Sequence, residues 1–272
     1  MIHFKIEMPE GPELKITRDN LIFLEDNYIN NLIILSGRYK KKIPEYWKEL
    51  TDSLPLKIIN VEVKGKLLYF ILENNWIILN TMGMSGRWTK QLQKHCHIEL
   101  VYNNTEKIWF CDIRRFGTIK ILKSMDLLET KLNSLGPDML NSNIKCSEFI
   151  EIMRKHNKKN ITKVLMNQSI ISGVGNYIKS ESLYDSNISP HNNIIDIDED
   201  RLIKLFHSIR KIMNLSYLSQ GATISTYYNI NDEIGDFSFK VYARKHDDEG
   251  KDIIREKTLD GRTSYWVKDI QY

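Results

Sequence analysis

The sequence has few cysteines and no long apolar run, and both absences exclude classes of protein. Only Cys96, Cys111 and Cys146 occur in 272 residues, and none of them forms a CxxC pair. Three cysteines cannot all pair within one chain, so we expect no disulfide framework and an intracellular, reducing compartment. Apolar runs such as Trp76–Leu79 fall far short of the roughly 20 residues that span a bilayer, and the first thirty residues carry too many charges for a secretory signal. We therefore expect no membrane partner.

Low-complexity segments and linkers rich in glycine and serine are also absent from the sequence. Hydrophobic residues make up 42% and charged residues 27%, which are ordinary values for a globular protein. A chain of 272 residues exceeds the roughly 100 to 200 of one domain and favours two compact units. The net charge of +4 is weak evidence for a polyanionic partner, but the basic residues gather between Arg154 and Lys163, where no acidic residue occurs.

The pattern of apolar residues divides the chain into a β-rich half and a helical half. Helix-like spacing predicts a helix over Leu14–Asn31, and the last part of the chain predicts a hairpin turning at Asp260-Gly261. Short alternating runs predict strands at residues 58–64, 66–72, 76–80, 97–102 and 108–110. Amphipathic stretches predict helices at residues 147–155, 161–167, 176–185 and 198–218.

Several short motifs occur in a fixed order along the whole chain. The first is Met8–Glu13, which composition alone would explain as the start of a helix. The others are Gly65–Leu68, Gly83–Gly86, Asp112–Gly117, Leu135–Asp138, Gly173–Leu183, Lys240–Arg244 and Gly261–Trp266. Together they resemble the formamidopyrimidine-DNA glycosylase and endonuclease VIII family from residue 8 to residue 271. Ile113 stands where the family pattern DPRRFG has proline.

The resemblance implies a catalytic set made of Pro9, Glu10, Glu13, Lys66 and Arg262. An N-terminal proline presents a secondary amine, and an α-amino group with a pKa of about 8 is neutral in a far larger fraction near pH 7 than a lysine with a pKa of about 10.4. Such an amine attacks the sugar C1′ and expels the damaged base. Glu10 would move protons at the sugar, with Glu13 supporting the site. Lys66 and Arg262 would contact phosphates and assist β- and δ-elimination.

The resemblance also implies residues that bind DNA around a flipped nucleotide. Met84, Arg114 and Phe116 would fill the gap in the duplex and contact the unpaired base. Backbone amides between Gly173 and Asn176 could hold a phosphate. Further DNA contacts would come from His95 in its strand, from Lys158 and Lys163, and from Asn176.

The C-terminal segment departs from relatives that carry a zinc finger. Those relatives have two CxxC pairs, whereas no cysteine follows Cys146 here. Four-sulfur zinc binding is therefore excluded, and we expect no metal and no cofactor. The segment resembles the zincless finger of the endonuclease VIII-like branch, a hairpin kept by apolar residues with Arg262 at its tip.

These inferences predict an α+β protein of two domains. Residues 8–135 would form a catalytic β-sandwich with flanking helices, residues 136–235 a helix-two-turn-helix domain, and residues 236–272 the zincless-finger hairpin. Double-stranded DNA with oxidised bases or abasic sites would lie between the domains of a monomer.

The predicted function is excision of oxidised pyrimidines and ring-opened purines, followed by strand cleavage through β,δ-elimination in base excision repair. The alternative is a non-catalytic damaged-DNA-binding protein that lacks a usable amine. Since Met1–Glu7 precede Met8, we expect either translation from Met8 or later removal of these residues, so that Pro9 becomes the first residue.

Overall fold

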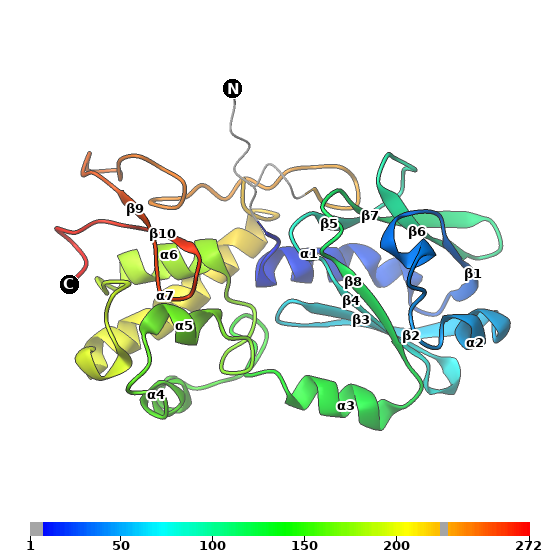
Figure 1. The fold of residues 1–272 in the computed structure, drawn as a ribbon, viewed down its shortest axis with the longest axis horizontal. Helices are drawn as coiled ribbons and strands as arrows, with labels where there is room; N and C mark the ends of the chain where they lie inside the picture. The colour runs from blue at the N-terminus through cyan, green and yellow to red at the C-terminus, as the bar shows by residue number, and fades with distance from the viewer. Residues whose placement is uncertain (1–7, 224–227) are drawn as a thin grey trace. The chain divides into compact units, whose positions relative to one another are not determined.

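The computed structural model describes residues 8–223 and 228–272, which separate into two compact units (Figure 1). The first unit consists mainly of Glu13–Ser134 and the second of Leu135–Ala222 with Asp236–Tyr272. The short segment Glu10–Pro12 clusters with the second unit. Residues 228–235, which the sequence pattern assigned to the helical domain, cluster with the first unit. The hairpin segment belongs to the helical unit rather than standing alone.

The first unit is built on one eight-stranded antiparallel sheet with the strand order β5-β7-β6-β1-β2-β3-β4-β8. Its strands are β1 Tyr28–Ile34, β2 Leu56–Lys64, β3 Leu67–Leu72, β4 Ile77–Thr81, β5 Gly86–Thr89, β6 Cys96–Tyr102, β7 Glu106–Asp112 and β8 Thr118–Leu122. Its helices are α1 Gly11–Leu21, α2 Trp47–Asp52 and α3 Met125–Asn133, with short 3-10 turns at Ile22–Leu24, Gly37–Lys40 and Glu73–Asn75.

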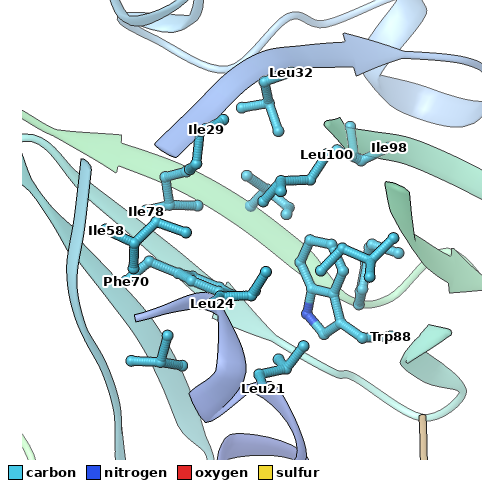
Figure 2. Close-up of a cluster of buried hydrophobic side chains, with 14 of the residues drawn as sticks. Leu21, Leu24, Ile29, Leu32, Ile58, Phe70, Ile78, Trp88, Ile98 and Leu100 are labelled. Carbon is cyan, nitrogen blue, oxygen red and sulfur yellow. The ribbon is translucent and has the colours of Figure 1, made fainter. Parts of the chain in front are cut away.

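The two halves of this sheet face each other as a sandwich. Phe70 of β3 packs on Trp88 of β5 with ring centroids 5.7 Å apart, although β3 and β5 lie far apart in the strand order. The Trp88 indole also donates to the side chain of Asn80 in β4 at 3.0 Å. Figure 2 shows these apolar side chains converging, with Leu21 and Leu24 closing the core beside them. The predicted β-sandwich with flanking helix is therefore confirmed.

The first helix is shorter than the sequence spacing predicted. The run Leu14–Asn31 contains residues 14–21 of α1, a 3-10 turn and the start of β1, and α1 itself begins at Gly11. Asp26 adopts a left-handed conformation with φ 65° after the 3-10 turn, and the chain then continues as a strand. Leucine and isoleucine at mixed intervals fit both a helix and an alternating strand, which is why the pattern misplaced this boundary.

The second unit contains a set of helices and a two-stranded hairpin. The helices are α4 Cys146–Arg154, α5 Ile161–Met166, α6 Asn176–Asp185 and α7 Glu199–Leu218, with a 3-10 turn at Ile194–Asp196. The Asp198 carboxylate accepts from the Arg201 amide and caps α7. Helix α6 packs on α7 and, on another side, on β10 (Figure 1). The four helices predicted for this unit all exist, each within one residue of the expected bounds.

The C-terminal hairpin differs from the prediction at its turn. Its strands are β9 Ile254–Lys257 and β10 Thr263–Trp266, and Thr263 pairs with Lys257. Five residues, 258–262, therefore connect the strands, instead of a two-residue turn at Asp260-Gly261. The Thr258 amide donates to the Arg262 carbonyl at 3.0 Å and closes this loop. Trp266 is only 8% exposed, as a hairpin kept by apolar packing requires.

Two of the three cysteines are paired, contrary to our expectation. Cys96 and Cys111 stand opposite each other in the register of β6 and β7 and form a disulfide. Cross-strand register cannot be read from a count of cysteines, so composition contained no indication of this pair. The expected reducing compartment loses its support from cysteine usage.

None of the helices within residues 8–223 and 228–272 is both long and apolar enough to cross a membrane.

The sandwich core generates a stability prediction. Phe70→Ala should lower the free energy of unfolding by about 3 to 5 kcal/mol, because a fully buried ring is lost from a core that cannot close the space. Ile59→Ala, at an exposed position on the neighbouring strand β2, should change it by less than about 0.5 kcal/mol. Urea unfolding followed by tryptophan fluorescence measures both values. Similar losses for the two variants would contradict the described core.

Candidate active site

The residues at the start of α1 are buried. Pro9, Glu10 and Glu13 are all inaccessible, Glu13 completely. The Glu10 carboxylate accepts hydrogen bonds from the backbone amides of Tyr177 at 2.8 Å and Ile178 at 3.3 Å. These amides belong to the first turn of α6, where unpaired N–H groups and the helix dipole favour a negative charge. Glu10 is therefore held as a carboxylate in a fixed position.

Gly11 allows this approach because it has no side chain. Its amide donates to the Gly173 carbonyl at 2.9 Å, which joins the chain start to the loop before α6. A Cβ at Gly11 would lie 3.1 Å from the Gly173 backbone and 2.7 Å from the end of Met213. Backbone can come this close to backbone only at a glycine.

The Glu10 contact lies next to a segment for which the sequence predicts phosphate binding. The segment Gly173–Asn176 was expected to present its helix-start amides to a phosphate. The next two backbone amides along the chain belong to Tyr177 and Ile178. Both donate hydrogen bonds to the carboxylate of Glu10. Sequence alone could not reveal this partner, because Tyr177 lies 167 residues from Glu10 along the chain.

Three polar side chains of α6 hold the C-terminal segment. Asn176 donates to the Thr263 carbonyl of β10 at 2.9 Å. Lys179 forms an ion pair with Asp260 at 2.7 Å. The Glu181 carboxylate accepts from three successive backbone amides, those of residues 240–242, at 2.7 to 3.0 Å. Burial raises the pKa of Glu181 even though these amides oppose the shift.

The pair of Lys179 and Asp260 lies next to the loop that ends at Arg262. Its side chains are 0% and 2% exposed, whereas Arg262 is exposed. Burial lowers the pKa of Lys179, while Asp260 and Glu10 favour its charged form and Arg262 opposes it. The charges of Asp260, Glu10 and Arg262 therefore all affect the pKa of Lys179. Burial disfavours the charge of Asp260, but Lys179 and Thr258 outweigh it and lower the pKa of this carboxyl.

In the first unit, Asp112 organises the loops that carry Met84, Arg114 and Phe116. Its buried carboxylate accepts from the Ser85 hydroxyl at 2.6 Å and from the Gly117 amide at 2.7 Å. The Ser85 oxygen in turn accepts from the Arg114 amide at 2.9 Å. One carboxylate thus joins the loop before β5 to the loop after β7.

The two loops are in direct contact where Gly83 has φ 61°. A Cβ at Gly83 would lie 2.5 Å from backbone atoms of Phe116 and Gly117. Phe116 remains 53% exposed, and the Arg114 guanidinium lies over its ring at 5.0 Å from the centroid. The structure therefore brings Met84, Arg114 and Phe116 together on adjoining loops.

The other predicted site residues are more scattered. Lys66 is half-exposed in the turn between β2 and β3. Lys158 and Lys163 are exposed, the first between α4 and α5 and the second on α5. His95 was expected within a strand, but it lies in the turn before β6 with φ 71°. Asn176 is half-buried, and its amide group faces the hairpin.

The C-terminal segment does not offer a zinc site. Within residues 8–223 and 228–272, no cluster of three or more histidine, cysteine, aspartate or glutamate side chains could hold a metal ion. His246 pairs with the exposed Asp252, and Trp266 and Val267 are buried in the packing of the hairpin. This donor set does not fit the four sulfur or nitrogen ligands of a structural zinc.

Sequence reasoning missed Lys179, Asp260 and Asp112 as organising residues. Lys179 carried a signal, because it is a lysine where the family pattern GVGNIYASESL has alanine. Asp260 is recognisable from the sequence only as a turn residue, since its partner lies on a distant helix. Asp112 is part of a matched motif, but its hydrogen-bond partners become visible only in the fold.

Comparisons with known proteins match both units of the chain. Residues 8–119 match the formamidopyrimidine-DNA glycosylase N-terminal domain, and residues 135–228 match the formamidopyrimidine-DNA glycosylase H2TH domain. The formamidopyrimidine-DNA glycosylases of Ureaplasma parvum serovar 3 and Rickettsia conorii are 30% and 31% identical to this chain, over 97% of it and 100% of their own length.

Solved structures share the fold. The MutM (Fpg) protein from Thermus thermophilus has a TM-score of 0.85 at 22% identity, covering 97% of this chain and 98% of its own. A Lactococcus lactis Fpg mutant, crystallised with DNA containing Fapy-dG, has a TM-score of 0.86 at 22% identity, covering 97% and 99%. The two matched domains and the full-length relatives show that the chain belongs to the formamidopyrimidine-DNA glycosylase and endonuclease VIII family of DNA repair glycosylases.

Proposed function

We propose that this protein is a bifunctional DNA glycosylase and abasic-site lyase that uses Pro9 as its nucleophile. The observation that carries the proposal is the buried carboxylate of Glu10, the residue that directly follows Pro9. This carboxylate is fixed by hydrogen bonds from two backbone amides of α6. A carboxylate held beside a reactive amine is what proton transfer at a sugar carbon requires. Family membership supports the same reaction class.

In this mechanism the Pro9 nitrogen attacks C1′ of the damaged nucleotide, and the bond from C1′ to the base breaks. The base leaves with its electron pair and takes up a proton, while the sugar ring opens and an iminium forms on Pro9. The iminium acidifies C2′, so that loss of that proton expels the 3′ phosphate, and a second elimination expels the 5′ phosphate. Glu10 moves protons at the sugar, Glu13 supports it from the next helical turn, and Lys66 and Arg262 contact phosphates.

The adjoining loops of the first unit supply the groups that replace a flipped base. Exposed Phe116 is suited to wedge between bases, and Arg114 carries donors for the base left unpaired. Met84 lies on the neighbouring loop that Asp112 holds. His95, Lys158, Lys163 and Asn176 would add contacts to the DNA backbone.

The mechanism requires a free amine at Pro9. In the sequence as given, Met8 precedes Pro9, and an amide nitrogen has no nucleophilic lone pair. Residues 1–7 lie outside the described residues. The match to the family's N-terminal domain begins at residue 8, which supports a mature chain that starts with Pro9.

Borohydride trapping on abasic DNA tests the nucleophile. We expect a covalent adduct from a chain begun at Met8 whose intact mass shows that Met8 has been removed, and none from a chain that keeps Met1–Glu7. Pro9→Gly should slow trapping, and Glu10→Gln should abolish excision of a damaged base. A strong adduct from the long chain would assign the nucleophile to a lysine, with Lys66 the first candidate. No adduct from either chain would favour the non-catalytic alternative.

Arg262 generates a second prediction. Arg262→Ala should lower turnover and reduce the slope of log binding constant against log salt by about 1, because one phosphate contact is lost. Folding should be intact, since the side chain is exposed. Binding to duplex DNA is measured across a salt series by fluorescence anisotropy, with Arg255→Ala on β9 as a control for charge alone. An unchanged slope for Arg262→Ala would mean that this loop does not contact DNA.

The proposed substrates are ring-opened purines and oxidised pyrimidines. The name of the matched relatives favours the formamidopyrimidines, and the hairpin without cysteines resembles the endonuclease VIII-like branch. We expect single-turnover excision of formamidopyrimidine-guanine, thymine glycol and dihydrouracil to be faster than excision of 8-oxoguanine opposite cytosine. The lesion range would be wrong if 8-oxoguanine were the fastest substrate in the same series.

A further inference from the structure

We propose that the buried ion pair between Lys179 and Asp260 positions the loop that carries Arg262, and that Lys179 is therefore a positioning residue for phosphate binding. This inference rests on the proposed function only in assigning Arg262 to a DNA phosphate. Lys179 stands where the motif GVGNIYASESL, which Gly173–Leu183 resembles, has alanine.

Asp260 determines the shape of the loop. One of its carboxylate oxygens accepts from the Thr258 hydroxyl at 2.7 Å and from the Arg262 amide at 3.3 Å. The other accepts from the Lys179 ammonium at 2.7 Å. The same carboxylate therefore folds residues 258–262 and attaches them to α6.

Helix α6 also holds Glu10. The amides of Tyr177 and Ile178, which hold the Glu10 carboxylate, directly precede Lys179 in the same helix. The loop of Arg262 and the carboxylate of Glu10 are thus fixed on adjacent residues of one element. If Glu10 transfers protons and Arg262 binds a phosphate, attachment to the same helix keeps the distance between the two groups constant. Catalysis requires such fixed positions.

The ion pair between Lys179 and Asp260 is buried, as a contact that positions a loop should be. Both side chains are almost fully removed from solvent, where an ion pair is sensitive to geometry and the loss of one partner leaves an uncompensated charge. Replacing both partners with uncharged residues removes that penalty. Single and double variants consequently separate stability from positioning.

The test compares Lys179→Met, Asp260→Ala and the double variant in the full chain. Both single variants should lower the melting temperature, and the double variant should restore most of that loss. If the pair positions Arg262, the double variant should nevertheless bind duplex DNA containing a tetrahydrofuran abasic analogue about tenfold more weakly and show a salt slope reduced by about 1. The matched control is Lys251→Met with Glu249→Ala, which removes an exposed pair of the same charges.

A double-mutant cycle shows whether Lys179 acts through Arg262. In an Arg262→Ala background, the double variant should produce no further loss of binding or of salt slope. A double variant with wild-type melting temperature, affinity and slope would overturn the proposal, as would full additivity with Arg262→Ala. Because the readout is binding to an analogue that cannot be excised, a protein that binds DNA but forms no adduct would refute the proposed lyase and leave this test intact.

Discussion

The candidate site depends on one interaction, in which the Glu10 carboxylate accepts hydrogen bonds from two backbone amides of α6. A helix start has unpaired N–H groups that need an acceptor, and a buried carboxylate needs donors, so each satisfies the other. The contact also requires the backbone of Gly11 to approach Gly173 without a side chain between them. Glu10 is therefore fixed by groups far along the chain. Because Pro9 is covalently joined to Glu10, its position is restricted as well.

Helix α6 has a second task, to hold the C-terminal segment of the chain. Here Asn176 bonds the backbone of β10, Lys179 pairs with Asp260, and Glu181 binds three amides in a row. Apolar packing of Tyr265, Trp266 and Val267 completes the attachment. A structural zinc fixes a loop through four strong bonds to its ligands. Helix α6 instead fixes the C-terminal segment through several hydrogen bonds, each of which requires a defined direction. The same element therefore supports both ends of the proposed chemistry in this unit.

Periodicity predicted the elements whose pattern was unambiguous. Alternation on either side of Asn103-Asn104 located β6 and β7, and the acids before residue 201 located the start of α7. It failed at Leu14–Asn31, where one set of apolar residues fits two periods, and at loop 258–262, whose length depends on register. The pairing of Cys96 with Cys111 depends on register in the same way. Motif order identified most candidate residues, but the partners of Glu10 and Lys179 are contacts across long separations, which no local pattern contains.

In both units, buried carboxylates hold the loops that carry candidate site residues. Asp112 joins the loops of Met84 and Phe116, Asp260 shapes the loop of Arg262, and Glu181 holds the turn at residues 240–242. A carboxylate has two oxygens that accept from several donors at once, so one side chain can fix two or three backbone positions. Burial disfavours the charged form of a carboxyl group, and it raises the pKa of Glu181. Apolar contacts would stabilise these loops as well, but they would leave the direction of each backbone amide unspecified. A loop that presents an arginine or a phenylalanine at a defined place would gain from the directional bond, and Asp112, Asp260 and Glu181 lie within or directly beside the matched motifs.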